Sequence, residues 1–229
     1  MKIVDDKVLM INTRRPELIT DKIKKSKVMG LLTTDIHEVA VNWGLKESQV
    51  LAELKIKDVP SPIKRDYQWT GKFAPFAHQK ETASFLSLRK RAFCFNEQGT
   101  GKTASVIWAA DYLMKLGIVR RVLVICPLSI MKSAWQQDLF KFAMHRSCSI
   151  AHGTAKAREN IIKAGSEFVI INFDGVAVVK DEIMRGGFDM IVVDEANAYK
   201  NAQTNRWKVL KQVSANTDWL WMLTGTPAA

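Results

Sequence analysis

The chain has 229 residues, of which 47% are hydrophobic and 25% are charged. This is the composition of a folded globular protein, and it excludes a disordered, collagen-like or disulfide-scaffold chain. Lys and Arg number 34 against 23 Asp and Glu, which gives a formal net charge of +11. Such an excess favours a polyanionic partner, most simply nucleic acid, although a basic protein without such a partner is the alternative.

Cysteine usage points to a reducing compartment. The cysteines are Cys94, Cys126 and Cys148, a widely spaced set without a CxxC pair, and the histidines show no metal-ligand spacing. The N-terminal stretch carries Asp5 and Asp6 where a signal peptide needs an apolar core, and no apolar run approaches the ~20 residues of a membrane span. We therefore expect a cytoplasmic protein with no membrane partner.

Residues 1–66 are predicted to form a small accessory α/β module. The apolar spacing predicts, in chain order, a strand at 7–12, a helix at 16–25, a strand at 37–43 and a helix at 46–56. A linker is indicated by Pro60-Ser61-Pro62, because proline interrupts both helices and strands. The module either contacts DNA or a partner, or braces the larger domain.

Residues 67–229 are predicted to form an α/β domain. Short apolar runs alternate with amphipathic segments, a pattern typical of a parallel sheet covered by helices on both faces. The expected strands cover 92–96, 121–126, 149–152, 168–172, 189–194 and 219–223. The expected helices cover 103–116, 130–142, 155–163, 176–184 and 206–213.

The segment after the first of these strands has the pattern of a phosphate-binding loop. It reads Gln98-Gly99-Thr100-Gly101-Lys102-Thr103 and opens the next expected helix. Glycines let backbone N–H groups face phosphate oxygens, and the helix N-terminus adds a positive dipole. Lys102 is then placed to bind the β- and γ-phosphates, and the Thr103 hydroxyl to ligate Mg²⁺. Asn96 stands where such a loop begins with Gly, and a glycine turn that caps a helix is the alternative.

A pair of carboxylates follows the buried strand at 189–194. Asp194 ends that strand, and the carboxyl edge of a parallel sheet is where α/β folds bind their ligands. Asp194 is placed there to hold Mg²⁺, and Glu195 to deprotonate an attacking water. A solvated strand end with two acids is the alternative, and the phosphate loop about ninety residues earlier argues against it.

Two weaker motifs flank these signals. Leu223-Thr224-Gly225-Thr226-Pro227 follows an apolar strand and, taken alone, is an ordinary turn. Gln79, in Phe76-Ala77-His78-Gln79, precedes the phosphate loop by some twenty residues. Its amide offers both a donor and an acceptor, which suits the edge of an adenine, whereas a surface helix position is the alternative. No chemistry is assigned to His78.

These four motifs, in this order, resemble those of superfamily two helicases, most closely the Swi/Snf-type branch. The resemblance covers residues 67–229 and implies a RecA-like P-loop domain, the first of two such lobes. The phosphate loop of that branch commonly reads DExGxGKT, so the segment 96–103 is similar to it with Asn for Asp. Small phage-encoded members carry a similar N-terminal module, which implies the cytoplasm of a bacterium or of a phage-infected host.

The resemblance also implies roles for further residues. Segments 124–135 and 170–175 stand where the family contacts the nucleic-acid backbone. The contact residues implied there are Pro127, Leu128, Ser129, Lys132, Asn172 and Asp174. Coupling of the nucleotide site to movement is implied for Asn197, which replaces the His of the family's DEAH box, and for Thr224 and Thr226.

The function implied is that of a DNA-dependent ATPase that uses ATP and Mg²⁺ and moves on DNA, most simply on duplex DNA. Motors of this family hydrolyse ATP between two lobes, and the second-lobe motifs, including a transition-state arginine, are absent from this sequence. We expect the chain alone to bind nucleotide weakly and to hydrolyse it poorly, because such an arginine contributes about 10³–10⁵ in rate. The alternatives are a strand-separating helicase of replication, recombination or repair, and a non-hydrolysing nucleic-acid-binding module.

Overall fold

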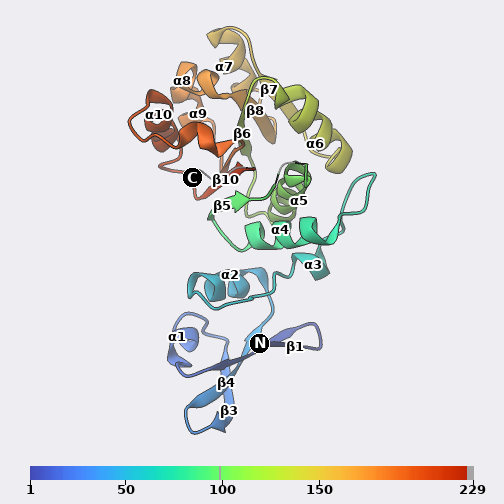
Figure 1. Ribbon diagram of the computed structural model, residues 1–229, viewed down its shortest axis with the longest axis vertical. Helices are drawn as coiled ribbons and strands as arrows, with labels where there is room; N and C mark the ends of the chain where they lie inside the picture. Colours follow the sequence, from blue (N-terminus) through green and yellow to red (C-terminus); the bar gives the residue numbers. More distant parts are fainter. Residues whose placement is uncertain (98, 226–229) are drawn as a thin grey trace. The chain divides into compact units, whose positions relative to one another are not determined.

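The computed structural model describes residues 1–97 and 99–225. The chain divides into two compact units, Met1–Tyr67 and Gln68–Ala229 (Figure 1). Each unit has its own sheet, and the two sheets differ in strand direction: the first is antiparallel and the second is parallel. Each unit is therefore described separately.

The first unit contains a four-stranded antiparallel sheet with the order β1-β2-β4-β3. Its strands are β1 (Lys2–Val4), β2 (Val8–Thr13), β3 (Lys27–Thr33) and β4 (Ile36–Asn42). Its helices are α1 (Glu17–Thr20), α2 (Leu45–Glu53) and α3 (Ile63–Asp66). The strands at 7–12 and 37–43 and the helix at 46–56 are confirmed to within a few residues, because alternating burial on β2 and β4 leaves a clear period in the sequence.

The same unit departs from the prediction in two places. The helix expected at 16–25 is the short α1, and strand β3 was not predicted. All seven residues of β3 are exposed, so the strand carries no buried face whose alternation would reveal it. Its pairing with β4 is also irregular, with register shifts on either side of the segment Gly30–Leu31.

The second unit is built on a six-stranded sheet with the order β5-β10-β9-β6-β8-β7. Every neighbouring pair in it is parallel. The strands are β5 (Arg91–Phe95), β6 (Val122–Cys126), β7 (Cys148–Ala151), β8 (Phe168–Asn172), β9 (Met190–Val193) and β10 (Trp219–Thr224). All residues of β6 and β9 are buried, which explains their continuous apolar sequences.

Helices cover both faces of this sheet, with α4, α5 and α6 on one side and α7 to α10 on the other (Figure 1). They are α4 (Ala77–Ser87), α5 (Lys102–Lys115), α6 (Gln137–Phe142), α7 (Ala155–Lys163), α8 (Phe173–Val178), α9 (Lys180–Arg185) and α10 (Asn205–Val213). A π-helical segment η1 (Met131–Gln136) precedes α6, and a 3₁₀ turn η2 (Ala196–Tyr199) follows β9. The predicted fold class, a parallel sheet flanked by helices, is confirmed.

The helix expected at 130–142 is thus two elements, η1 and α6. A π-helix has i to i+5 hydrogen bonds in place of i to i+4, and its rare single-turn segments are frequently found at functional sites. Apolar spacing alone does not distinguish such a turn from an α-helical one, so the sequence predicted a single helix here.

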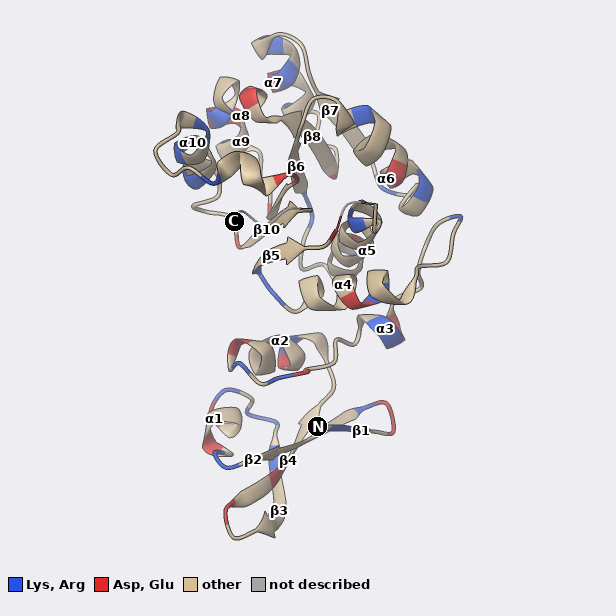
Figure 2. Ribbon diagram, viewed as in Figure 1, with Lys and Arg blue, Asp and Glu red and all other residues tan. Residues whose placement is uncertain are grey.

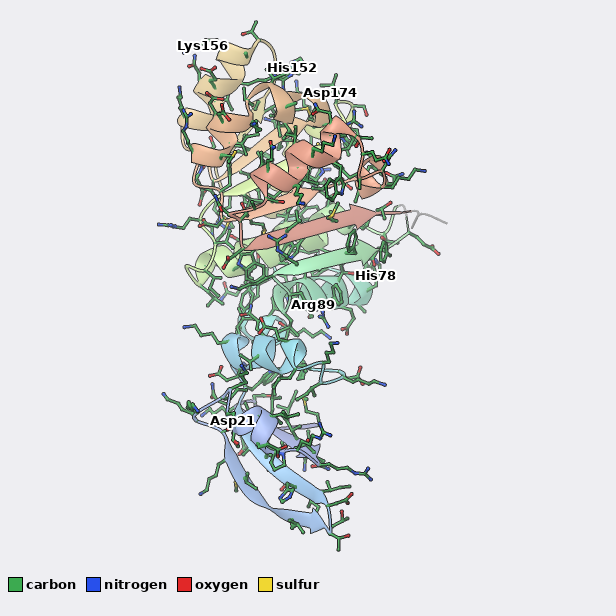
Figure 3. The ribbon with its side chains drawn as sticks, turned by 90° about the vertical axis from the view of Figure 1, so that its left-hand side faces the viewer. Asp21, His78, Arg89, His152, Lys156 and Asp174 are labelled. Atoms are coloured by element: carbon green, nitrogen blue, oxygen red, sulfur yellow. The ribbon has the colours of Figure 1, made fainter. Side chains whose placement is uncertain are left out.

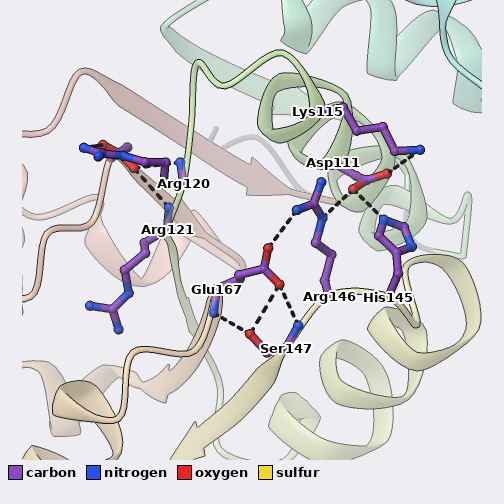
Figure 4. Close-up of polar contacts among 9 residues, drawn as sticks. Asp111, Lys115, Arg120, Arg121, His145, Arg146, Ser147 and Glu167 are labelled. Atoms are coloured by element: carbon purple, nitrogen blue, oxygen red, sulfur yellow. Dashed lines mark hydrogen bonds and ion pairs between the residues drawn. The ribbon is translucent and has the colours of Figure 1, made fainter.

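A buried carboxylate of α5 belongs to a hydrogen-bond network that reaches the amino ends of β7 and β8 (Figure 4). Asp111 is fully buried, and its Oδ1 accepts hydrogen bonds from Arg146 Nε at 2.6 Å and from His145 Nε2 at 2.9 Å. Arg146 also donates to Glu167 Oε1 at 2.7 Å, and the backbone N–H of Ser147 donates to Glu167 Oε2 at 2.8 Å. The helix after the phosphate loop is therefore tied to the starts of β7 and β8.

The outer strand β5 presents two aromatic rings to solvent. Phe93 is 56% exposed and Phe95 57% exposed, and their ring centroids lie 5.7 Å apart in a stacked arrangement. Cys94, between them, points to the opposite face and is buried. Among the described residues β5 pairs with β10 alone, so its other edge has no strand partner.

Candidate nucleotide site

The carboxyl ends of β5, β10 and β9 meet at one edge of the second sheet. Phe95 at the end of β5 pairs with Thr224 of β10, and Met222 of β10 pairs with Val193 at the end of β9. The segments that follow β5 and β9 therefore leave the sheet at the same edge, with the end of β10 between them. This is the edge at which parallel sheets bind their ligands.

The loop after β5 has a backbone that glycine makes possible. Gly99 has a φ of +77° and Gly101 a φ of +73°, both in the left-handed region. A Cβ on Gly101 would run into the amide nitrogen of Gln79, so any larger residue there would force the Gln79 side chain to move. α5 begins at the next residue, Lys102, and its free N–H groups and dipole face the loop. A helix N-terminus that follows a glycine-rich loop is a common binding site for phosphate groups.

Lys102 is folded onto the loop that precedes it. Its ammonium donates to the carbonyl oxygen of Asn96 at 2.8 Å and to that of Glu97 at 2.9 Å. Thr100 Oγ1 closes the turn by donating to the same Glu97 carbonyl at 2.8 Å. Phosphate oxygens would therefore compete with two carbonyls for a cation that is already at the loop. Gln98 lies outside the described residues.

Two side chains of α4 hold the other end of the loop. His78 Nε2 lies 2.9 Å from the carbonyl oxygen of Thr100, and Gln79 Nε2 donates to the same oxygen at 3.4 Å. Gln79 Oε1 accepts from the backbone N–H of Phe76 at 2.9 Å, and the residue is 8% exposed. Both ends of its amide are engaged within the protein, so adenine recognition by Gln79 stays a prediction. The contact of His78 was missed, because nothing in the sequence shows which way its ring points.

Asp194 is held by hydrogen bonds to both of its carboxylate oxygens. Oδ2 accepts from Trp135 Nε1 at 2.9 Å, and Oδ1 accepts from the backbone N–H of Glu195 at 2.9 Å. The residue is 7% exposed. Burial raises the pKa of the Asp194 carboxyl above its ordinary value, and these hydrogen bonds and the charge of Lys102 offset part of the rise. Trp135 was not singled out from the sequence as part of the site.

The charge of the Lys102 loop reaches the acidic motif at the same edge of the sheet. Burial is the largest influence on the pKa of Asp194 and raises it, and the charge of Lys102 offsets part of that rise. Burial raises the pKa of the Cys94 thiol, which lies close enough to both that Lys102 opposes the rise and Asp194 adds to it. Lys102 in the phosphate loop and Asp194 after β9 therefore both act electrostatically on the same thiol.

Glu195 adopts a backbone conformation that is rare for its residue type. Its φ is 54° and its ψ 54°, which is the left-handed region. Residues other than Gly, Asn and Asp are uncommon in this region, and those that adopt it concentrate at functional sites. The turn is closed by the backbone N–H of Ala198, which donates to the Glu195 carbonyl at 3.0 Å. This conformation turns the chain sharply after Asp194 and leaves the Glu195 side chain half-buried.

The side chains at this edge fit a magnesium ion that arrives with a nucleotide. Within residues 1–97 and 99–225, no three His, Cys, Asp or Glu side chains gather into a ready-made metal site. Mg²⁺ is usually held by one or two carboxylates together with phosphate oxygens and waters. Asp194, with the hydroxyl of Thr103 in the first turn of α5, is a donor set of that kind.

The residues predicted to contact nucleic acid lie at or after the carboxyl ends of two other strands, β6 and β8, at the same edge of the sheet. Leu128, Ser129 and Lys132 are exposed after β6, and Pro127 is half-buried. Asn172, at the end of β8, accepts from an Arg158 nitrogen at 2.9 Å. Asp174 is exposed and accepts from Arg206 Nη2 at 2.8 Å. Figure 3 shows Asp174 and His78 on the side of the unit toward which the strand arrows point.

The predicted coupling residues are divided between the described and undescribed parts of the chain. Asn197 is exposed on η2, two residues after Glu195. Thr224 is buried at the end of β10, beside the phosphate loop strand. Thr226 lies outside the described residues.

A RecA-like sheet whose first strand leads through a glycine loop into a helix defines the class of P-loop nucleotide-binding domains. Within that class, the profile of the SNF2-related domain matches residues 78–229. The chain belongs to the SNF2-related family, and the resemblance seen in its motifs is confirmed.

Individual relatives agree with this assignment. The chain is 31% identical over 134 residues to an uncharacterized ATP-dependent helicase of Mycoplasma pneumoniae, an alignment that covers 58% of this chain and 13% of the relative. It is 25% identical over 186 residues to the ISWI chromatin-remodeling complex ATPase ISW2 of Saccharomyces cerevisiae, covering 76% of this chain and 16% of that protein. The chain thus spans a small part of the length of these relatives.

Among solved structures, the fold is similar to the SWI2/SNF2 ATPase core of Sulfolobus solfataricus. The core solved in complex with dsDNA superposes with a TM-score of 0.61 at 27% identity and covers 69% of this chain and 33% of that chain. The core domain alone gives a TM-score of 0.56 at 26% identity. In the part of the chain that the structure describes, no helix has the length and apolar character needed to cross a lipid bilayer.

Proposed function

We propose that this chain is the ATP-binding lobe of a DNA-dependent ATPase that moves on DNA when it is joined to a second RecA-like lobe. The observation that carries the proposal is the shared edge of the sheet. There the Lys102 loop lies at the N-terminus of α5, and the charge of Lys102 acts to lower the pKa of the Asp194 carboxyl, against the larger effect of burial. Membership of the SNF2-related family supports the same reading.

Each group at the edge has a proposed task. The N–H groups from Gly99 to Thr103 bind phosphate oxygens, and Lys102 exchanges its loop carbonyls for the β- and γ-phosphates. Asp194 and the Thr103 hydroxyl hold Mg²⁺, which when bound neutralises charge on the phosphate oxygens. Glu195 orients the attacking water and accepts its proton. Gln79 is proposed to recognise adenine once its amide is released from Thr100.

DNA is the proposed polyanionic partner, most simply as a duplex. The net charge of +11 supports it, and Figure 2 shows Lys and Arg on α6, α7 and α10. The exposed residues Ser129 and Lys132 follow β6 at the nucleotide edge, and the Sulfolobus solfataricus core was solved with dsDNA. Backbone contacts through these residues would give binding that weakens steeply with salt and ignores sequence.

A second lobe is the other proposed partner. The cleft between two RecA-like lobes is where an arginine can reach the transferred phosphoryl group, and that arginine is worth about 10³–10⁵ in rate. Asn197, Thr224 and Thr226 are proposed to relay the state of the nucleotide to the nucleic acid. A reducing cytoplasm stays a prediction, in keeping with three free cysteines.

Two measurements test the proposal. Calorimetric titration of the 229-residue chain with Mg-ATP should give one binding site, and a chain that ignores saturating Mg-ATP would contradict it. In a form joined to a second lobe, duplex DNA should stimulate ATP hydrolysis more than single-stranded DNA does. Because a Mycoplasma pneumoniae relative is named a helicase, strand displacement is the second candidate, and its detection would favour that function. Binding without turnover in every form would favour a non-hydrolysing module.

A further inference from the structure

Trp135 joins the nucleotide edge to the segment proposed to contact DNA. It is fully buried, and its indole N–H donates to Asp194 Oδ2 at 2.9 Å, across 59 positions of the sequence. A hydrogen bond to a carboxylate is stronger than one between neutral groups. With Glu195 N–H on the other oxygen, the two bonds fix the plane in which the Asp194 carboxylate lies.

The segment that carries Trp135 has two functional faces. Trp135 lies in η1, the π-helical segment Met131–Gln136, and points into the core toward Asp194. Lys132, one turn earlier, is exposed, and Ser129 just before the segment is exposed as well. Ser133 Oγ donates to the Ser129 carbonyl at 3.0 Å, which ties the loop after β6 to η1. The exposed residues and the buried indole therefore belong to one short, continuous segment.

Other fully buried tryptophans of the same unit show that this arrangement is particular to Trp135. Trp221 Nε1 donates to the backbone carbonyl of Arg89 at 2.8 Å, and Trp108 Nε1 to that of Thr70 at 2.7 Å. These two indoles satisfy structural carbonyls, whereas the indole of Trp135 binds a side chain of the proposed magnesium site. Satisfying a buried indole N–H does not require a carboxylate, so the choice of partner calls for another explanation.

We propose that Trp135 is a positioning residue that couples the DNA-contacting segment 127–132 to the Asp194 carboxylate. The inference rests on the proposed function, since it assumes Mg-nucleotide at Asp194 and DNA at this segment. DNA that shifts η1 changes the direction in which Asp194 presents its free lone pairs, and thus the affinity for Mg-nucleotide. By thermodynamic linkage, Mg-nucleotide changes the affinity for DNA by the same factor.

The first test leaves the sequence unchanged. In ¹⁵N-indole NMR of the 229-residue chain, duplex DNA added without nucleotide should shift the Nε1–H resonance of Trp135 and leave that of Trp221 in place. The resonances are assigned by their loss in Trp135→Phe and Trp221→Phe. An unmoved Trp135 resonance at saturating duplex would overturn the inference.

The second test measures the coupling itself. The dissociation constant of Mg-AMP-PNP is measured with and without saturating duplex DNA, and DNA should change it about 5-fold or more in the wild type. In Trp135→Phe that ratio should fall to within twofold of one, while the matched control Trp221→Phe keeps the wild-type ratio. Near-UV circular dichroism checks that both variants are folded.

The outcomes separate this inference from the proposed function. If the wild-type chain does not bind Mg-AMP-PNP, the proposed function is wrong and the inference falls with it. If the wild type binds but Trp135→Phe keeps the full DNA effect, or the wild type shows none, only the inference is wrong. If Trp221→Phe loses the coupling as completely as Trp135→Phe, a general loosening of the core explains the result and the inference is overturned.

Discussion

The ammonium nitrogen of Lys102 lies 2.8 Å from the carbonyl oxygen of Asn96, so the two ends of the phosphate loop are joined directly. Asn96 is itself fixed, because its Nδ2 donates to Thr82 Oγ1 of α4 at 2.7 Å. The loop is therefore held in shape by contacts between its own ends and α4. This arrangement explains how a loop that begins with Asn instead of Gly is accommodated.

Lys102→Ala should weaken the binding of Mg-ATP by 10-fold or more. Charge-assisted hydrogen bonds of this kind contribute about 1.5–3 kcal/mol each, and the variant loses all that Lys102 makes to phosphate. Isothermal titration calorimetry of the 229-residue chain measures the change. Lys90→Ala is the matched control, since Lys90 pairs with Asp218 at the opposite end of β5 and its loss should leave the affinity unchanged. Equal affinities for Lys102→Ala and wild type would contradict the proposed role.

Asn96→Asp should destabilise the second unit although Asp is the residue that the family commonly carries at this position. Thr82 Oγ1 already donates its proton to the carbonyl of His78 at 2.9 Å, so it is left to accept a proton from Asn96. An Asp carboxylate has no proton to donate, and the lost hydrogen bond should lower the free energy of unfolding by about 1 kcal/mol. Urea denaturation measures this. Asn96→Asp combined with Thr82→Ala should cost no more than Thr82→Ala alone; a fully additive loss would contradict the pairing.

Glu195 offers a matched pair of substitutions that separates chemistry from backbone strain. Glu195→Gln keeps the left-handed strain and Glu195→Asn relieves part of it, because Asn tolerates this conformation better. Both variants should bind Mg-ATP and lose turnover in a form that carries a second lobe. Only Glu195→Asn should raise the free energy of unfolding, by about 0.5–1 kcal/mol, in thermal denaturation. Turnover that survives in either variant would rule out Glu195 as the base.

Acid should weaken the contact between Glu167 and the start of β7. Burial raises the pKa of the Glu167 carboxyl, but the hydrogen bonds from Ser147 and Arg146 outweigh it, so the pKa in the folded chain lies below its ordinary value. A carboxyl with a lowered pKa stabilises the fold at neutral pH, and this contribution is lost as pH falls through that pKa.

Glu167→Gln should therefore be less stable than the wild type at pH 7. The difference should shrink as the pH falls below the ordinary Glu value of about 4.3. Urea denaturation at a series of pH values measures it. A difference that stays constant down to pH 3 would show that the charge of Glu167 is not what stabilises this contact.

The parts of the site that could be predicted from the sequence are those whose chemistry is tied to the end of a strand. Asp194 and Lys102 were predicted together because each follows an apolar run, and parallel strands end at the same edge. The hydrogen bond between Trp135 and Asp194 could not be predicted, because its partners are 59 positions apart and depend on the packing of η1. The contact of His78 with Thr100 depends in the same way on how α4 is placed.

The fold shows the same division. Buried strands such as β6 were predicted from their apolar sequences, whereas β3 was not, because a fully exposed strand has no buried face to reveal it. The π-helical turn η1 was also missed, since its apolar positions fit an ordinary helix equally well. What the sequence pattern leaves open is thus how elements contact one another and how exposed segments pair.

The stacked rings of Phe93 and Phe95 set a practical condition for handling the purified chain. An outer strand with exposed aromatic rings favours self-association, because a neighbouring molecule can contact both its apolar surface and the edge that, among the described residues, has no strand partner. The apparent molecular mass measured by light scattering should rise with protein concentration, and Phe93→Lys should keep it at the value of the monomer. Affinities for nucleotide and DNA are therefore best measured in dilute solution, where the chain is monomeric.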